Sequence, residues 1–352
     1  MKLDVFLEMA SPPWVDRSPA DIIAESVEIA VAAEAAGCDT LWLPEHHFLE
    51  GYSNSAAPDM VLAAVSQATM RLKLGFAIIP LPIHDPLRVA ERLTVLDALA
   101  PGRVRWGVGR GVTVTELQAF DIDPADSRAV FEARFRELSD ILSSGMAERG
   151  GERLAVQPPV SKNLGAGWLA AVSPESFDFA AAHGLNVMTG PFKPWAFVNA
   201  DLARYRAKKP DGETSFTLSV YCEADRDAAR ARASEGLIWV YRRLFEIARP
   251  ILSKQVEGYE HYRQLGWTVP LLNKMLSVTV LEKLGLAAIG TPEHVVARLT
   301  ELQRSGLDRV NLMVGGGDLT PAEVGAALAQ IGEVWAADEE AAFVSSDMTV
   351  PA

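Results

Sequence analysis

Residues 72–109, LKLGFAIIPLPIHDPLRVAERLTVLDALAPGRVRWGVG, contain the repeating unit from which the fold is predicted. The apolar runs at 72–80 and 103–109 have the length and continuity of buried strands. Between them, residues 85–100 show helical periodicity, with leucine recurring on one face. Apolar strands joined by an amphipathic helix are typical of a parallel sheet that is covered by helices on its outer side.

The same alternation continues through nearly the whole chain. Further strands are predicted at 3–7, 39–43, 168–172, 185–189, 215–222 and 309–314. Further helices are predicted near 18–36, 59–69, 127–143, 174–183, 195–207, 225–247, 292–304 and 321–335. Eight strands, each followed by at least one helix, favour an α/β fold of the (β/α)8 TIM-barrel type. A doubly wound open sheet is the alternative, but GVGRGV (107–112) matches its dinucleotide-binding motif only weakly, and these glycines are interpreted as allowing close backbone approach at a strand end.

One domain and a tail are expected. Residues 1–335 are predicted to form a single (β/α)8 barrel domain. Segment 250–286 interrupts the alternation without a strand pattern, and we expect a helical insertion there, near the C-terminal third. Residues 336–352 are polar and acidic and are expected to form a loosely ordered tail.

Composition argues against several functional classes. Lys and Arg number 33 against 46 Asp and Glu, a net charge of -13, so nucleic acid and membrane surfaces would be repelled on average. The two cysteines, Cys38 and Cys222, cannot form a disulfide framework and suit a reducing compartment. The N-terminal stretch is interrupted by Asp4 and Glu8, unlike a signal peptide, and no run of 18 apolar residues predicts a membrane span. A soluble, cytoplasmic protein is expected.

The strand ends carry the candidate chemistry, because a (β/α)8 barrel builds its active site at the carboxyl ends of its strands. The second strand ends in Glu45, His46 and His47. Adjacent histidines on extended backbone point to opposite sides, so only one of them can face the cavity. Catalytic zinc needs three ligands from separate directions, and no H-x-H or H-E-x-x-H motif occurs. A metal site is therefore disfavoured.

An anion site is predicted at the start of the helix near 174–183. Ser173 is placed as the N-cap and Pro174 as the first helical residue, so free N–H groups and the helix dipole favour an anion there. Arg110, at the end of the neighbouring strand, can reach the same anion, and Arg128 is a candidate second cation. The alternative interpretation is an ordinary capped helix beside solvated arginines.

The chain resembles the bacterial-luciferase-like family of flavin-dependent monooxygenases over nearly its whole length. The resemblance rests on AGCDTLWLPEHHF (36–48), LGFAIIPLPIHDPLRVAERLTVLDALAPGRVRWGVGRG (74–111), DSRAVFE (126–132), AAVSPES (170–176) and AAIGTPEHV (287–295). It implies a (β/α)8 barrel that binds reduced FMN from a separate reductase and reacts it with O2. The family uses the resulting flavin C4a-peroxide on a small organic substrate, and its members are commonly homodimers.

The resemblance also implies roles for individual residues. His46 matches the active-site histidine beside the flavin, and Glu45 is expected to orient it, to pair with an arginine or to remain a buried wall residue. The FMN phosphate site is matched by Arg110, Val172, Ser173 and Ser176, with Arg128 as a second cation. Ala77–Ile78 matches a non-prolyl cis peptide that lets the backbone approach the isoalloxazine ring.

Some features depart from the family pattern. Gly109 replaces the cysteine that lies near the flavin in luciferase, and segment 250–286 only loosely resembles its mobile lid. We therefore expect a non-luminescent, two-component FMN-dependent monooxygenase. Two alternatives remain: a deazaflavin-dependent hydride-transfer enzyme on the same barrel, and a flavin-binding protein without catalysis.

Overall fold

The computed structural model describes residues 1–111, 113–191, 193–252 and 275–347. Most of the predicted insertion, residues 253–274, lies outside the described residues, as does the end of the predicted tail. Within the predicted insertion the chain is described again from Met275 and forms the short helix α12 (Val278–Lys283).

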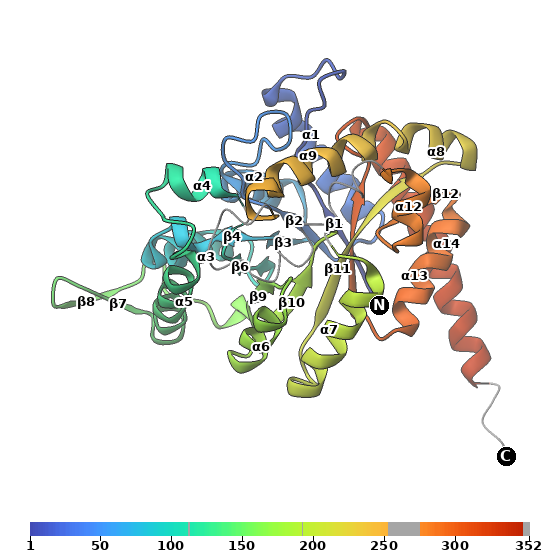
Figure 1. Ribbon diagram of the computed structural model, residues 1–352. Helices are drawn as coiled ribbons and strands as arrows, with labels where there is room; N and C mark the ends of the chain where they lie inside the picture. Colours follow the sequence, from blue (N-terminus) through green and yellow to red (C-terminus); the bar gives the residue numbers. More distant parts are fainter. Residues whose placement is uncertain (112, 192, 253–274, 348–352) are drawn as a thin grey trace.

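The main sheet is parallel in every recorded strand pair and curls around an interior (Figure 1). Its strands are β1 (Lys2–Phe6), β2 (Thr40–Leu43), β3 (Lys73–Phe76), β4 (Ile79–Pro80), β5 (Val104–Arg105), β6 (Gly107–Gly109), β9 (Trp168–Ala170), β10 (Asn186–Thr189), β11 (Thr214–Cys222), β12 (Ala287–Gly290) and β13 (Arg309–Val314). Their order is β4-β6-β9-β10-β11-β13-β1-β2-β3-β5, and β12 pairs with β11. Each of the eight predicted strands contains an observed strand, and two of them are divided into two pieces.

Helices cover the outer side of the sheet (Figure 1). They are α1 (Pro19–Ala35), α2 (Pro58–Ala68), α3 (Pro86–Leu99), α5 (Ser127–Ser144), α6 (Pro174–Ala182), α7 (Trp195–Lys208), α8 (Arg226–Ala233), α13 (Pro292–Arg304) and α14 (Pro321–Asp347). Helices α4 (Val114–Ala119) and α9 (Gly236–Leu252) instead lie at the carboxyl ends of the strands. Several begin with proline after a capping side chain: Ser18 caps α1, Asp85 caps α3 and Thr291 caps α13.

Several elements differ from the sequence-based predictions. The single helix expected at 225–247 is two helices, α8 and α9, with a break at Ser234 and Glu235. Helix α14 continues to Asp347, past the expected end at 335, so part of the predicted tail is helical. Strand β12, helix α4 and an antiparallel hairpin of β7 (Met146–Arg149) with β8 (Glu152–Ala155) were not predicted.

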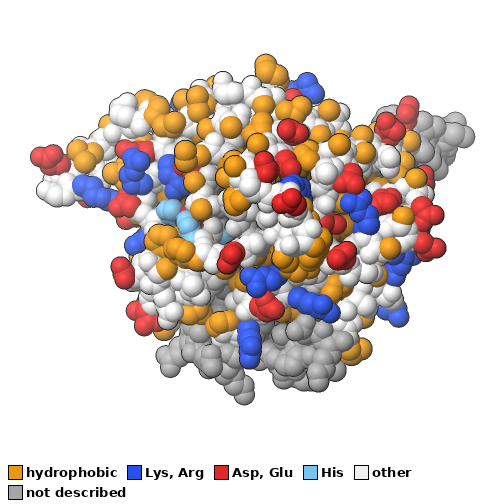
Figure 2. Space-filling view, turned by 90° about the horizontal axis from the view of Figure 1, so that it is seen from above, with side chains coloured by type: hydrophobic (Ala, Val, Ile, Leu, Met, Phe, Trp, Pro, Cys, Tyr) orange, Lys and Arg blue, Asp and Glu red, His pale blue; other side chains and the backbone are white. Residues whose placement is uncertain are grey.

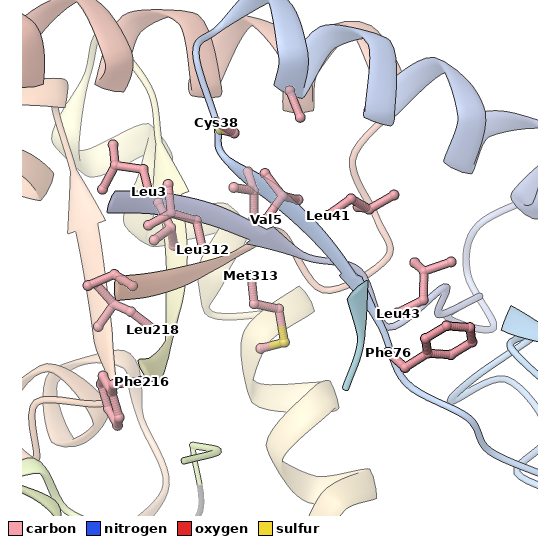
Figure 3. Packing of buried hydrophobic residues seen from close by; sticks show 14 of the residues in the cluster. Leu3, Val5, Cys38, Leu41, Leu43, Phe76, Phe216, Leu218, Leu312 and Met313 are labelled. Carbon is pink, nitrogen blue, oxygen red and sulfur yellow. The ribbon is translucent and has the colours of Figure 1, made fainter. Parts of the chain in front are cut away.

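The core follows the period-two alternation of strand side chains. Leu3 and Val5 of β1 belong to the main hydrophobic cluster, and Figure 3 shows them beside Leu312 of β13. Trp42 forms a second cluster with Trp168 and Met188, and Phe6, on the opposite face of β1 from Val5, packs against it. The side chains of this second cluster point into the interior that the sheet encloses.

A buried polar network fills the interior near the amino ends of the strands. The Asp4 carboxylate accepts a 3.0 Å hydrogen bond from the Trp42 indole N–H and lies 3.3 Å from Nε of Arg309. Burial raises the pKa of Asp4 to about 6, even though the Arg309 charge acts against this increase. The network occupies the end of the interior that lies opposite the carboxyl ends of the strands.

Gly75 is required by the close approach of Trp42 on the neighbouring strand. A Cβ atom at this position would lie 2.2 Å from Cε3 of Trp42. Gly75→Ala is therefore expected to lower the free energy of unfolding by roughly 1–3 kcal/mol through overpacking, measured by chemical denaturation. In a Trp42→Leu background the same substitution should cost less, and an equal cost in both backgrounds would contradict this explanation.

The described surface is mixed in charge. On the face shown in Figure 2, acidic and basic side chains of the described residues are interspersed with hydrophobic ones. No helix within the described residues is long and apolar enough to cross a membrane.

Candidate active site

A cavity of about 210 Å³ lies at the carboxyl ends of the strands. Residues that follow β1, β2, β6 and β9 line it, together with parts of α5, α6 and α9. All nine residues predicted for the site contribute to its wall: Glu45, His46, Ala77, Ile78, Arg110, Arg128, Val172, Ser173 and Ser176. The structure thus brings together residues that are up to 131 positions apart in the sequence, from Glu45 to Ser176 (176 minus 45).

His46 lies between two buried carboxylates. Its Nδ1 is 3.1 Å from Oε1 of Glu116, and its Nε2 is 3.6 Å from Oε1 of Glu8. Burial alone would lower the pKa of His46, but the hydrogen bond with Glu116 and the charges of Glu8 and Glu116 outweigh it and raise this pKa. The site therefore holds an imidazole that binds a proton more readily than a free histidine does.

Glu116 is held in place by several donors. It lies in the first turn of α4, whose N-cap Thr113 donates its hydroxyl to this carboxylate. The backbone N–H of His47 also donates to it, at 2.7 Å. Burial raises the pKa of Glu116, but these hydrogen bonds and that of His46 prevail and lower it, so Glu116 is a carboxylate at neutral pH.

Glu45 belongs to a different group of side chains. Its Oε1 is 3.0 Å from Nε2 of His47 and 2.5 Å from Nε2 of His84, and Arg92 lies 3.7 Å from Oε2. The His47 ring packs edge-on against Phe120 with 4.9 Å between ring centroids, and His47 is not among the residues that line the cavity. The prediction that only one of the two adjacent histidines faces the cavity is confirmed.

Glu45 is expected to stabilise the fold above its own titration range. Burial raises its pKa, but hydrogen bonds from His47 and His84 outweigh this effect and lower the pKa from 4.5 to about 2. This stability is present above pH 4.5 and is lost as the pH falls toward 2, and it amounts to roughly 3 kcal/mol. Glu45→Gln should therefore lower the unfolding free energy at pH 7 and flatten its fall below pH 4.5 in denaturation curves. An identical acid profile in both proteins would contradict this role.

Another part of the cavity wall, here called the cationic end, contains Arg110 and Arg128 and includes the start of α6. Ser173 is the N-cap, and Ser176 accepts 3.1 Å hydrogen bonds from the backbone N–H groups of Val172 and Ser173. Arg110 follows β6, and Arg128 lies in the first turn of α5. Glu132, one turn further along α5, lines the same cavity. A phosphate group suits two guanidinium groups beside a helix start.

The Ala77–Ile78 peptide bond is cis, as predicted, and interrupts the strand between β3 and β4. A Cβ atom at Gly109 would lie 2.9 Å from Cγ1 and Cδ1 of Ile78. A Cβ atom at Gly107 would lie 2.5 Å from the backbone oxygen of Phe76. Ile78 thus occupies the space that a side chain at position 109 would need, and the glycines permit the close approach that the sequence predicts.

Comparison with known proteins agrees with the resemblance seen in the sequence. A family model described as luciferase-like monooxygenase matches residues 1–309. The chain belongs to this family. Relatives with a functional name are monooxygenases, and this protein is an enzyme of that kind.

Individual relatives are distant. Limonene 1,2-monooxygenase from Rhodococcus erythropolis is 28% identical over 316 residues, which cover 83% of this chain and 75% of that protein. The solved structure of monooxygenase RslO1 from Streptomyces bottropensis has a TM-score of 0.78 at 21% identity, covering 95% and 98% of the two chains. The oxygenating constituent of 3,6-diketocamphane monooxygenase from Pseudomonas putida, in complex with FMN, has a TM-score of 0.75 at 15% identity, covering 95% and 97%. These structural likenesses show the fold alone.

The two acidic residues beside His46 in this luciferase-like monooxygenase were not predicted. Glu8 follows the first strand, and the rule that active-site residues lie at the carboxyl ends of barrel strands therefore applies to it as well. Glu116 is three residues after Thr113, a spacing typical of a helix start, but its contact with His46 spans 70 positions and has no local signal. Within the described residues, no group of three His, Cys, Asp or Glu side chains could hold a metal ion.

Proposed function

We propose that the protein is the oxygenase component of a two-component system. It would receive reduced FMN from a separate flavin reductase and use O2 to oxidise a small, largely apolar organic substrate without emitting light. The observation that carries this proposal is one cavity with His46 between two carboxylates on one side, and Arg110 and Arg128 beside the start of α6 on another.

The residues of the cavity fit FMN. Arg110 and Arg128 supply positive charge for the phosphate, and Arg128 has no hydrogen-bond or ion-pair partner among the described residues. Ala77, Ile78 and Gly109 form a surface of backbone and small apolar groups that a flat ring can approach. We propose that the phosphate is bound at the cationic end by Arg110, Arg128 and the 172–176 turn, and that the ring system lies toward His46.

The side chains of this protein would bind the flavin, orient it and the substrate, and supply or accept a proton. Bound reduced FMN supplies the electrons with which O2 is activated. His46 holds a proton beside the cavity and delivers or accepts it at Nε2, while Glu116 fixes the ring through Nδ1. We propose that Glu45 supports the wall through His47 and His84 rather than acting on the substrate.

The remaining wall of the cavity suits an apolar substrate. One face of α9 contributes Val240, Tyr241, Leu244 and Ile247. Aromatic side chains from other elements, Phe6, Phe131 and Phe179, complete it. Terpenes and aliphatic aldehydes, which the names of the relatives suggest, are therefore the first substrates to try.

Three further expectations belong to this proposal. We propose that residues 1–335 are a single domain whose curled sheet is an eight-stranded barrel. The two ends of the strand order, β4 and β5, support closure. Strand β4 directly follows β3 in the chain, and β6 directly follows β5. Because β3 pairs with β5 and β4 pairs with β6, these two neighbouring segments connect the ends of the sheet. A homodimer and a cytoplasmic location remain proposals.

The proposed activity is tested by product analysis. The protein, FMN, a flavin reductase and NADH are incubated with limonene, alkanals, ketones or sulfonates under ¹⁸O2, and the products are identified by mass spectrometry. One atom of ¹⁸O in an oxidised product is expected for at least one substrate. Oxidation without incorporated ¹⁸O, or turnover only with a deazaflavin coenzyme, would contradict the proposal.

A further inference from the structure

Glu8 is a buried carboxylic acid that the mechanism above does not use. It comes two residues after the end of β1, is 8% exposed and lines the cavity beside His46. Its Oε1 has no hydrogen-bond partner within the described residues and lies 3.6 Å from Nε2 of His46. A buried carboxyl oxygen without a hydrogen bond is costly, which suggests a role for this group.

The other side of the imidazole is already engaged. Nδ1 of His46 is 3.1 Å from Glu116, a carboxylate that also accepts hydrogen bonds from Thr113 and from the backbone of His47. A carboxylate only accepts, so Nδ1 carries a hydrogen that it donates to Glu116. Nε2 is therefore the nitrogen that gains or loses a proton, and it faces Glu8.

The surroundings raise the pKa of both Glu8 and His46. Burial raises the pKa of Glu8 to about 7, although the His46 charge acts against this rise, while the Glu116 charge reinforces it. Burial also raises the pKa of Tyr52, so this phenol stays neutral. Behind Glu8, a smaller cavity of about 50 Å³ is also lined by Arg17 and Glu25, which pair with each other at 2.6 Å.

We propose that Glu8 is a positioning residue for His46, and that its carboxyl group and Nε2 of His46 share one proton at the cavity wall. In one form Glu8 is a carboxylic acid and His46 is neutral; in the other the proton has moved to Nε2, leaving a carboxylate and an imidazolium. When the imidazolium gives this proton to a base in the cavity, a carboxylate and a neutral imidazole remain, and a proton from water restores the pair. The use of this proton in substrate oxidation rests on the proposed function, whereas the shared proton does not.

The test therefore uses the flavin-free protein. Histidine side chains are labelled with ¹³C and ¹⁵N, the His46 signals are assigned from their loss in His46→Gln, and their shifts are followed against pH by NMR. Glu8→Gln keeps the size of the side chain and removes its charge. It should lower the pKa of His46 by roughly 1 unit or more, as expected for loss of a neighbouring opposite charge.

Glu50→Gln is the matched control, because it removes the same charge from an exposed position in the loop that follows His46. It should leave the pKa of His46 nearly unchanged. A Glu8→Gln effect as small as that of Glu50→Gln would overturn the proposal, and thermal melting checks that both variants are folded.

A second measurement needs no variant of Glu8. Two groups that share a proton titrate in two coupled steps, so the His46 signals of the wild-type protein should show two inflections. A curve with a single inflection would contradict the shared proton. Failure of either NMR test leaves the proposed monooxygenase activity standing, and absence of activity leaves the NMR result standing, so the two failures are distinguishable.

Discussion

His46→Ala is expected to lower kcat for substrate oxidation by roughly 10²–10⁴-fold, the usual contribution of a positioned acid–base group. The imidazole lies on the cavity wall, bonds Glu116 through Nδ1 and has a raised pKa, so its Nε2 is the nitrogen that takes up and releases a proton. Binding of reduced FMN should change little, because the predicted phosphate contacts are made by Arg110, Arg128 and the 172–176 turn and not by His46. Steady-state kinetics with a reductase and the best substrate of the panel measure the loss.

His47→Ala is the matched control for this result. It removes the adjacent imidazole, whose ring bonds Glu45 and packs on Phe120 instead of lining the cavity. A much smaller loss of kcat is expected. Unchanged turnover in His46→Ala would remove this residue from the mechanism, and equal losses in the two variants would show that the loop, and not His46 itself, is responsible.

Arg110→Ala is expected to weaken the binding of reduced FMN by roughly 1.5–3 kcal/mol, the contribution of a hydrogen bond to a charged group. This corresponds to an increase in Kd of roughly 10- to 150-fold. Arg110 lines the cavity beside the start of α6, where the guanidinium can bind phosphate through two parallel hydrogen bonds. Fluorescence titration under anaerobic conditions measures the change.

Arg88→Ala controls for the loss of one positive charge. Arg88 lies on α3 with its side chain 69% exposed and pairs with Glu91 on the same helix. Its removal should leave the Kd within experimental error of wild type. If Arg110→Ala binds reduced FMN as tightly as Arg88→Ala, the phosphate lies elsewhere.

The regular part of the fold is predictable because its strands are apolar and its helices amphipathic. The unit at 72–109 becomes β3, β4, α3, β5 and β6 nearly at the predicted limits. The hairpin at 146–155 was missed because β8 is exposed along its whole length and has no apolar periodicity. Its signal is the pair Gly150 and Gly151, both with positive φ, which suits a two-residue turn.

A site residue is predictable from sequence where its position along a strand determines whether its side chain faces the cavity. Strand alternation separates His46 from His47, and the rule of carboxyl ends brings Arg110 and Ser173 to the same cavity. The choice between roles for Glu45 could not be made from sequence, because His84, which bonds it, is 39 positions away. Glu116 needed the folded chain for the same reason.

The central claim is that this cavity binds reduced FMN, and one anaerobic titration tests it directly. The protein is titrated in parallel with reduced FMN and with a reduced deazaflavin coenzyme, and binding is followed by fluorescence. Saturable binding of reduced FMN that is weakened by Arg110→Ala, with much weaker binding of the deazaflavin, is the expected result. Tight deazaflavin binding with no affinity for reduced FMN would contradict the claim.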